Sequence, residues 1–386
     1  MTITTDVVII GGGVQGASLA FHLAKRGIKV IVVEKNFIAA GATGRSSGLV
    51  RMHYDTEVDS RLAWVSFQYF RNWKQMVGGE CGFTRTGFLQ IVAADRMDAL
   101  QANVKMHQQI GIPSILISGD DVKRLSPFMN TDDIVLAAYE PESGYAMPSD
   151  TANAFMQAAR GKGAQLLQNC SVTAVQIEGG RVKGVETTQG AISAPVIVNA
   201  AGAWADGINK MVGLDLPYTT WRHDTMFVVR PPEIGPSHPT VIDFGYEMYF
   251  RPEGDLTLVG LEDGNPLGES PDNDTDHALP GFVERAIDRL CHRFPIMERG
   301  ALHSAHGGYD GLTPDQHPLL GAAGPEGFYL DCGHSGTGFK TSPAVGLCMS
   351  ELILDGAAKT IDFSSLSPQR YSQGKMIKGN YENIWR

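Results

Sequence analysis

The chain has 386 residues, a length that usually divides into two domains. Its formal net charge of -10 argues against a nucleic-acid partner, because nucleic-acid-binding proteins normally present a basic face. Apolar residues make up 43% of the chain and charged residues 19%, as in an ordinary globular protein. The composition therefore excludes a disordered or fibrous protein.

The first elements expected along the chain form a βαβ unit. The apolar, β-branched run at residues 7–10 is typical of a buried parallel strand, and a second such run occupies residues 30–33. Between them, Leu19, Ala20, Leu23 and Ala24 recur at helical spacing, and Gly27 supplies a helix stop. The sequence therefore predicts strand, helix and strand with a right-handed crossover.

A glycine fingerprint joins the first strand to the helix. Gly11, Gly13 and Gly16 fit the pattern G-x-G-x-x-G in the context that the pattern requires. The first glycine permits a tight turn, the second lets a pyrophosphate approach the backbone, and the third allows the helix to pack closely on the strand. Glu34 ends the second strand, where a carboxylate can accept hydrogen bonds from the ribose hydroxyls and repels a 2′-phosphate. The sequence predicts a site for FAD or NAD rather than NADP.

The rest of the chain alternates between the two kinds of domain. Small and polar residues fill a loop at 39–48, and a helical pattern covers 62–73. Short alternating strands at 169–175 and 182–187, joined by Gly179 and Gly180, predict a hairpin or meander, and a buried strand follows at 196–198. Residues 217–266, rich in Pro, Tyr, Phe and Arg, predict a largely antiparallel second domain. The last hundred residues return to glycine-rich loops beside apolar elements.

Five cysteines, Cys81, Cys170, Cys291, Cys332 and Cys348, are scattered without paired spacing, which indicates no zinc site or redox dithiol and favours a reducing compartment. The amino terminus lacks the pattern of a secretion signal, and no apolar run is long enough to span a bilayer. We therefore expect a cytoplasmic protein with no membrane span and no bound metal.

Three further segments carry glycines in a specific context. They are residues 41–51 (GATGRSSGLVR), residues 199–204 (NAAGAW) and residues 333–340 (GHSGTGFK). With these segments and the fingerprint, the chain resembles the D-amino acid oxidase superfamily of FAD-dependent oxidoreductases over nearly its whole length. Within that superfamily it is most similar to the branch of sarcosine oxidase and the β-subunit of dye-linked L-proline dehydrogenase.

The resemblance implies an α/β (α+β) fold with a Rossmann-like FAD-binding domain, discontinuous in sequence, over residues 1–85, 145–216 and 300–386. A mainly antiparallel substrate domain would occupy residues 86–144 and 217–299. It also implies that FAD contacts the fingerprint, the loop at residues 41–51 (called the flavin loop below), the strand that holds Val172 at the adenine, and the later glycine segments. The residues concerned are Gly11, Gly13, Val14, Gln15, Gly16, Glu34, Lys35, Thr43, Gly44, Arg45, Ser46, Ser47, Val172, Ala200, Gly202, Trp204, Gly308, Gly336, Thr337, Gly338, Phe339 and Lys340.

Non-covalent attachment of FAD is expected from one departure, and the absence of a second covalent flavin from another. Monomeric sarcosine oxidase links its FAD to a cysteine, but residues 306–309 here read His-Gly-Gly-Tyr. Heterotetrameric relatives carry a second flavin on a histidine, where this chain has Ser149.

The resemblance assigns Arg51 and Lys340 to the substrate carboxylate, which a guanidinium fork suits well. The D-amino acid oxidase branch uses an arginine in a Gly-x-Arg-Pro segment, but residues 311–314 here read Gly-Leu-Thr-Pro. Tyr249, His223 and His53 are candidates to line the substrate pocket, although each of them is also compatible with a structural role. Tyr54, beside His53, is likewise a candidate for the pocket that is also compatible with a structural role.

The expected reaction is oxidation of a small secondary amine or amino acid by hydride transfer to flavin N5, followed by hydrolysis of the imine and reoxidation of the flavin by O2 with release of H2O2. Sarcosine oxidase activates oxygen with a lysine that residues 256–260 lack. One alternative is therefore a dehydrogenase that passes electrons to a quinone, a dye or a partner subunit. Another is a flavin-binding scaffold subunit without turnover. A homo-oligomer or a partner subunit is compatible with each of them.

Overall fold

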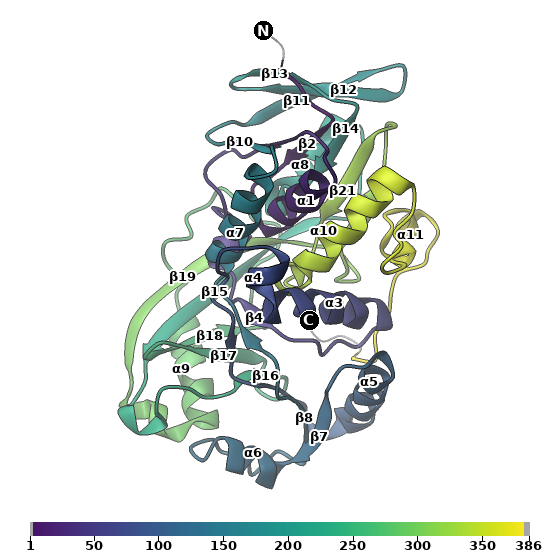
Figure 1. Ribbon diagram of the computed structural model, residues 1–386. Helices are drawn as coiled ribbons and strands as arrows, with labels where there is room; N and C mark the ends of the chain where they lie inside the picture. The colour runs from purple at the N-terminus through teal and green to yellow at the C-terminus, as the bar shows by residue number, and fades with distance from the viewer. Residues whose placement is uncertain (1–2, 382–386) are drawn as a thin grey trace.

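The computed structural model describes residues 3–381 and divides them between an upper and a lower lobe (Figure 1). A six-stranded sheet forms the centre of the upper lobe, and an eight-stranded sheet forms the lower one. Helix α3 (Glu57–Arg71) and a small three-stranded sheet lie between them. All five cysteines are free. No helix in residues 3–381 is both long and apolar enough to cross a membrane.

The six-stranded sheet contains the predicted βαβ unit. The fingerprint separates β2 (Val7–Ile10) from α1 (Val14–Lys25), and β3 (Val30–Val33) returns parallel to β2. The remaining strands extend the sheet on both sides, in the order β10, β3, β2, β14, β21, β20: β10 (Gln165–Leu167), β14 (Val196–Asn199), β21 (Phe328–Cys332) and β20 (Leu319–Ala322). Every pair is parallel except β20 with β21.

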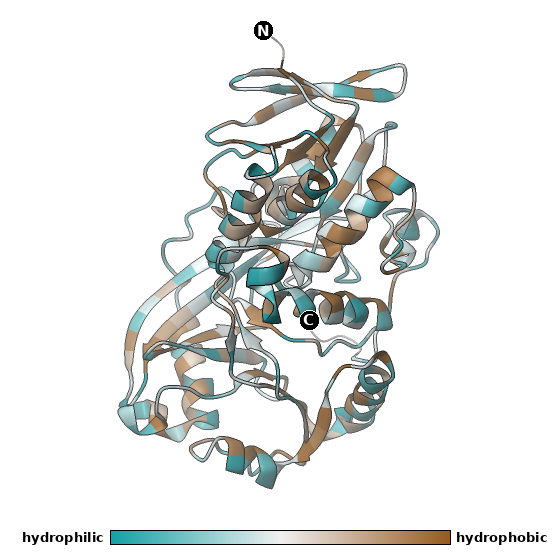
Figure 2. Ribbon diagram, viewed as in Figure 1, coloured by the Kyte–Doolittle hydropathy of each residue, from teal (hydrophilic) through white to brown (hydrophobic). Residues whose placement is uncertain are grey.

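Both faces of this sheet are covered, which explains the continuous apolar run of β2. Val7 and Ile9 pack with the helices α1, α7 (Pro148–Arg160) and α10 (Gly338–Asp355). Val8 and Ile10 pack against the opposite layer. That layer is α8 (Ala205–Met211) and a small sheet of β1 (Ile3–Thr4), β13 (Gly190–Ser193), β12 (Arg181–Thr187) and β11 (Val172–Glu178). Figure 2 shows the hydrophobic residues gathered in the strands of the upper sheet.

The predicted hairpin is confirmed. Strands β11 and β12 pair antiparallel, and Gly179 and Gly180 join them with φ of 61° and 76°. Both angles lie in the left-handed region that glycine enters without steric cost.

The lower sheet confirms the expected antiparallel domain. Its order is β19 (Ala301–Leu312), β15 (Thr219–Val229), β18 (Leu256–Leu261), β17 (Met248–Glu253), β16 (Thr240–Asp243), β6 (Phe88–Ile91), β8 (Leu136–Glu140) and β7 (Ile115–Ser118). Only the pair β16 and β6 is parallel. Strand β19 follows residue 300 yet pairs with β15, and the domain boundaries drawn from the sequence stay a prediction.

Side-chain alternation gives the lower sheet two different faces. Val241, Phe250 and Val259 pack in one core cluster with α9 (Phe282–Arg293). Their neighbours Ile242 and Tyr249 face the other way, toward the upper lobe.

The connecting layer completes the chain. Strands β4 (Leu49–Val50), β9 (Gly144–Tyr145) and β5 (Thr84–Arg85) form the three-stranded sheet. The expected helix at 62–73 is α3, which begins at Glu57 after a Thr56 cap. The short helices are α2 (Ala42–Arg45), α4 (Trp73–Met76), α6 (Gly119–Leu125) and α11 (Gln369–Ser372), and α5 (Met97–Ile110) flanks the lower sheet.

Candidate active site

A cavity lined by residues of both main sheets connects them. It encloses about 1930 Å³, its open mouth included. At one end it is lined by residues at the carboxyl ends of the upper strands, such as Ile10, Val33 and Ala200. At the other end it reaches Ile242 and Tyr249 of the lower sheet. Ligands of open α/β sheets bind at the carboxyl ends of the strands, so the cavity lies where a dinucleotide is expected.

The fingerprint leaves the backbone no room for side chains. Gly11 has φ of 114°, and a Cβ on it would lie 2.4 Å from the carbonyl oxygen of Ala200. A Cβ on Gly16 would lie 2.1 Å from the carbonyl oxygen of Gly11. Glycine at both positions therefore allows α1 to approach the ends of β2 and β14 closely.

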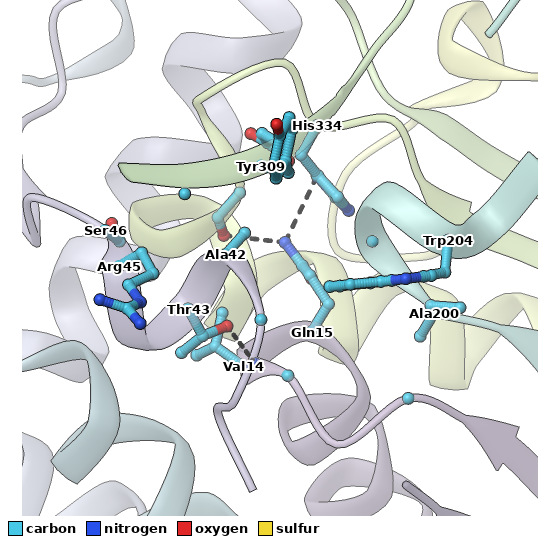
Figure 3. A pocket seen from close by; sticks show the side chains of 18 of the residues that line it. Val14, Gln15, Ala42, Thr43, Arg45, Ser46, Ala200, Trp204, Tyr309 and His334 are labelled. Carbon is cyan, nitrogen blue, oxygen red and sulfur yellow. Dashed lines mark hydrogen bonds between the residues drawn. The ribbon is translucent and has the colours of Figure 1, made fainter. Parts of the chain in front are cut away.

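Helix α1 begins at the cavity without a cap. Its N-cap residue Gly13 offers no side chain, and the first turn has no acidic residue. Free N–H groups at a helix N-terminus bind anions, and Gly13, Val14 and Gln15 all line the cavity. The N–H of Val14 donates to Thr43 Oγ1 at 3.0 Å, which ties α1 to the flavin loop (Figure 3). These residues fit the pyrophosphate of a dinucleotide.

Glu34 and Lys35 lie at the predicted ribose end. Glu34 Oε2 accepts the N–H of Gly12 at 2.7 Å, and Oε1 accepts the N–H of Asn36 at 2.8 Å. The carboxylate is thereby fixed at the cavity wall and keeps acceptor capacity for hydroxyl groups. The Lys35 amine lies 3.8 Å from the ring centroid of Trp204 and is ion-paired with Asp272.

Most of the predicted cofactor residues line this one cavity: Gly11, Gly13, Val14, Gln15, Glu34, Lys35, Thr43, Arg45, Ser46, Ser47, Val172, Ala200, Gly202, Trp204, Gly308, Gly336, Gly338, Phe339 and Lys340. Gly16, Gly44 and Thr337 lie just behind it. A Cβ on Gly44 would lie 2.5 Å from the carbonyl oxygen of Ala39, and Thr337 Oγ1 donates to the carbonyl of His334 at 2.7 Å. These three residues shape the backbone that carries the wall.

A row of polar side chains in contact, which the sequence analysis missed, links the fingerprint to the last glycine segment. Gln15 Nε2 donates to the carbonyl of Gly338 at 2.8 Å and lies 3.4 Å from His334 Nδ1 (Figure 3). His334 Nε2 lies 3.0 Å from Asp331 Oδ1. Asp331 lies within β21, one residue before its carboxyl end, and that position was the signal that could have identified it.

The amino end of α10 carries Lys340 at the cavity. The amine donates to the carbonyl of Gly336 at 3.2 Å. Burial lowers the pKa of Lys340 well below its usual value, the nearby charge of Arg51 lowers it further, and Glu262 and Asp310 oppose the shift. The Asp310 carboxyl accepts the N–H groups of Gly311 and Gly336, and burial raises its pKa.

Arg51 follows β4 directly and is 5% exposed. One end of its guanidinium donates to the carbonyl of His53 and lies over the ring of Tyr54, 4.3 Å from the centroid. Its Nε makes no hydrogen bond within residues 3–381. The wall of the cavity includes Arg51.

Tyr249 and His223 lie together on the cavity face of the lower sheet. Their ring centroids are 6.3 Å apart, and both line the cavity. Tyr249 pairs with Gly260 across β17 and β18, where a Cβ would lie 2.2 Å from the phenol oxygen. Burial raises the pKa of Tyr249 and lowers the pKa of His223 to about 3, so both side chains are neutral at physiological pH.

Glu262, which the sequence analysis also missed, lies on the same wall. It follows the last residue of β18 and is 8% exposed. Burial raises its pKa to about 7, and the charges of Lys340 and Arg51 counteract that rise. Glu262 stands two residues after Gly260 and therefore points to the same face of the strand. Once the strand was assigned, this spacing could have identified Glu262 as a residue of the cavity wall.

His53 is not among the residues of the cavity wall. It lies behind Arg51, 1% exposed, with Nε2 2.8 Å from the hydroxyl of Tyr381. Burial lowers its pKa, and the charges of His107 and Arg51 add to that shift. Its catalytic role stays a prediction.

His53, His107 and Glu140 form the single group within residues 3–381 with the ligand types and spacing for a metal ion, their ligand atoms all within 4.8 Å of one another. Glu140 Oε2 accepts from Met52 N and Ser143 Oγ. The positive charge of Arg51 acts on all three groups and opposes a divalent cation there. Burial raises the pKa of Glu140 to about 7, which favours a proton on this carboxyl.

A glycine fingerprint at the strand ends of a Rossmann-like sheet, with a second sheet closing the cavity, defines a dinucleotide-dependent protein with two lobes. A family model described as "FAD dependent oxidoreductase" matches residues 6–352. The chain therefore belongs to this family of FAD-dependent oxidoreductases, as the resemblance implied.

Relatives and solved structures agree with this assignment. The mitochondrial sarcosine dehydrogenase of Homo sapiens is 31% identical over an alignment of 369 residues, and the match covers 92% of this chain and 40% of that protein. The sarcosine oxidase subunit beta of Arthrobacter sp. is 26% identical over an alignment of 385 residues, and the match covers 96% of this chain and 92% of that subunit. The crystal structure of L-proline dehydrogenase from P. horikoshii has a TM-score of 0.91 at 27% identity and covers 98% of this chain and 100% of its own. The chain thus spans less than half the length of the first of these relatives.

Proposed function

We propose that this chain oxidises a small amino acid or carboxylated amine, N-alkylated or cyclic, at its C–N bond, with FAD as the cofactor. The observation that carries the proposal is the meeting of Arg51 and Lys340 in the dinucleotide cavity, beside Tyr249 and His223. Two cationic side chains suit a substrate carboxylate. The relatives named for sarcosine and proline support the same substrate class.

Bound FAD supplies a two-electron acceptor for the hydride that leaves the carbon next to the substrate nitrogen. The free Nε of Arg51 and the amine of Lys340 hold the carboxylate and so fix the position of that carbon. A docked carboxylate also favours the charged form of Lys340, because an opposite charge offsets the effect of burial. Tyr249 and the neutral His223 form an uncharged wall that limits the access of water. The resulting imine is hydrolysed to an aldehyde or oxo acid and an amine.

We propose that FAD is bound non-covalently, because residues 306–309 contain no cysteine, and that no second covalent flavin is present, because residue 149 is serine. A Cβ on Gly308 would lie 2.7 Å from Cβ of Arg45, so this part of the wall is made by close backbone contact. Acid precipitation should release the yellow colour into the supernatant. Colour retained in the pellet would contradict this part of the proposal.

The oxidase and dehydrogenase alternatives differ in the acceptor that reoxidises the flavin. In the first, O2 reoxidises the flavin and H2O2 is released. In the second, a quinone, a dye or a partner subunit takes the electrons. The second is favoured by β18, which has no lysine facing the cavity, and by relatives that are named dehydrogenases.

An anaerobic titration of the purified holoprotein tests the proposal. Sarcosine, dimethylglycine and proline are added in turn while the flavin absorbance is followed, with acetate and dimethylamine as controls that lack the amine or the carboxylate. We expect at least one amino acid, and neither control, to bleach the flavin. Recovery in air within seconds with peroxide would identify an oxidase, and recovery only with an added dye would identify a dehydrogenase. A flavin that dithionite reduces but no amino acid reduces would overturn the proposal.

A further inference from the structure

Glu262 is a buried carboxylate that the roles given so far do not use. Its backbone N–H donates to the carbonyl of Glu247 at 2.8 Å, which fixes the turn after β18. Its side chain lines the cavity, and Oε2 makes no hydrogen bond to any described residue. Buried carboxylates normally have partners, because removing a charge from water is costly unless hydrogen bonds replace the water. Because Glu262 lines the cavity, the missing partner of its buried Oε2 points to a ligand that contacts this carboxylate there.

The cations nearest to Glu262 do not satisfy it. Both Lys340 and Arg51 act on its charge, yet no ion pair within 4.0 Å joins Glu262 to either of them in the described part of the chain. The cavity wall therefore carries the cations Lys340 and Arg51 and, without an ion pair to either, the carboxylate of Glu262. The other carboxylates of the wall, Glu34, Asp310 and Asp331, already have hydrogen-bond partners. A molecule with a carboxylate at one end and a protonated amine at the other matches this arrangement of charge.

We propose that Glu262 binds the substrate's protonated amine and accepts its N–H proton at Oε2, before the hydride leaves. This inference rests on the proposed function. In the first step the N–H bond breaks, an O–H bond forms on Glu262, and the electron pair stays on nitrogen. In the second step a hydride, with two electrons, leaves the adjacent carbon, for which bound FAD would be the acceptor, and the nitrogen pair forms the C=N bond. Water then adds to that bond and releases the carbonyl product and the amine.

The first step is needed because an ammonium has no free electron pair to stabilise the positive charge that develops as hydride leaves. Glu262 suits this role at neutral pH, since an efficient base has a pKa near the working pH. Burial sets its raised pKa of about 7. The ionisable groups around it come from several elements: Lys340 and Arg51, which lower the pKa, Glu247 and Asp263, which raise it, and the neutral Tyr249 and His223 on the same wall.

The proposal narrows the substrate class. Primary, secondary and tertiary amino acids bring a proton on nitrogen that Oε2 can accept. A quaternary amine such as trimethylglycine has none and no free electron pair, so it should leave the flavin oxidised. A carboxylic acid without an amine should bind more weakly than the amino acid of the same shape.

The first test is anaerobic stopped-flow reduction of the flavin by the best amino acid between pH 6 and pH 10. In the wild-type protein, we expect the rate to rise with pH through one ionisation near neutrality. Glu262→Gln should slow reduction at pH 7 by about 100-fold, the scale of a general base. The rate of this variant should recover toward pH 10, where the free amine already lacks the proton. Glu262→Asp should still show part of the rise in rate near neutral pH. The control Glu284→Gln, on the exposed side of α9, should behave as the wild type.

A second readout does not need turnover. 2-Aminoisobutyrate has no hydrogen on its α carbon, and pivalate is the same shape with a methyl group in place of the amine. Their dissociation constants are measured from the flavin spectrum of the holoprotein. The wild type should prefer 2-aminoisobutyrate over pivalate, and Glu262→Gln should reduce that preference by about tenfold or more, since a charged hydrogen bond contributes on that scale.

The outcomes separate the two proposals. An unchanged pH profile in Glu262→Gln, or equal changes in the binding of both acids, would show that Glu262 only balances the charge of Lys340 and Arg51, and would overturn this inference. If no amino acid reduces the wild-type flavin, the proposed function fails, and the preference for 2-aminoisobutyrate still decides whether Glu262 recognises an amine.

Discussion

The two ends of the cavity are built in different ways. At the cofactor end, contiguous glycines bring the backbone of β2 and α1 close to Ala200, and the helix N-terminus offers N–H groups. At the substrate end, Arg51, Lys340 and Glu262 come from distant parts of the chain and contribute charged side chains. A cofactor of fixed shape can be held by backbone geometry, whereas a small zwitterion is recognised by the placement of opposite charges.

The difference also appears in the electrostatics. Burial shifts the pKa of Lys340 downward and that of Glu262 upward. Perturbed groups of this kind gather where chemistry takes place. Substitutions at the cofactor end should therefore act through steric conflict, and those at the substrate end through charge.

The largest effect is expected at the fingerprint. Gly11→Ala places a methyl group 2.4 Å from the carbonyl oxygen of Ala200 at a φ of 114°. Overpacking of this kind costs about 1–3 kcal/mol, in addition to the backbone strain. We expect most of the bound FAD to be lost, measured as the ratio of absorbance at flavin and protein wavelengths. Gly207→Ala, also on the cavity wall but with nothing near the added methyl group, should retain FAD, and equal loss in both variants would refute the steric explanation.

At the substrate end, Arg51→Lys keeps the charge but removes the guanidinium fork. We expect kcat/KM for the amino acid to fall by about 10- to 100-fold, the scale of a charge-assisted hydrogen bond. Oxidation of an amine without a carboxylate should change little. Arg61→Lys, on the exposed side of α3, serves as the control. An unchanged KM for the amino acid would remove Arg51 from carboxylate binding.

A smaller effect concerns the polar cluster behind Arg51. The pKa of Glu140 rises from 4.5 to about 7 on folding, so the folded state holds an extra proton between these values. The stabilising contribution of Glu140 to the free energy of unfolding is fully present below pH 4.5 and is lost as the pH rises through 7. In total it is on the order of 3 kcal/mol. Glu140→Gln should remove that slope and be the more stable form at pH 8, measured by urea unfolding at pH 5 and pH 8. The surface variant Glu142→Gln should keep the wild-type slope, and a slope retained by Glu140→Gln would contradict the assignment.

The smallest effect is expected at a surface contact beside the cofactor end of the cavity. Asp272 Oδ1 accepts from Lys35 and from Trp204 Nε1, each at 2.8 Å. Because Asp272 is exposed, Asp272→Asn should cost less than about 1 kcal/mol. We expect a rise of only a few fold in the dissociation constant for FAD, abolished at high salt. A loss of FAD as large as that of Gly11→Ala would show that this contact, rather than the backbone, holds the cofactor.

Sequence reasoning succeeded where the signal is local. The run Val7 to Ile10, the glycines after it and Glu34 lie within one βαβ unit, so their spacing alone predicted β2, α1 and β3. The hairpin at Gly179 and Gly180 was found for the same reason. Glu262, Asp310 and His334 were missed, since each is an ordinary polar residue in its own segment.

The sequence by itself determined the cofactor end, because the backbone geometry that a pyrophosphate requires is encoded in consecutive glycines. For the proposed substrate end, the sequence named Arg51, Lys340 and Tyr249 only through the resemblance, and the tertiary structure decided that they meet on one wall with Glu262. Side-chain alternation in the lower sheet sends Tyr249 and Glu262 toward the cavity, and the packing of α10 against the upper sheet brings Lys340 to Arg51. The charge state of such groups depends on burial and on neighbours far away in the chain, and neither is present in a local pattern of residues.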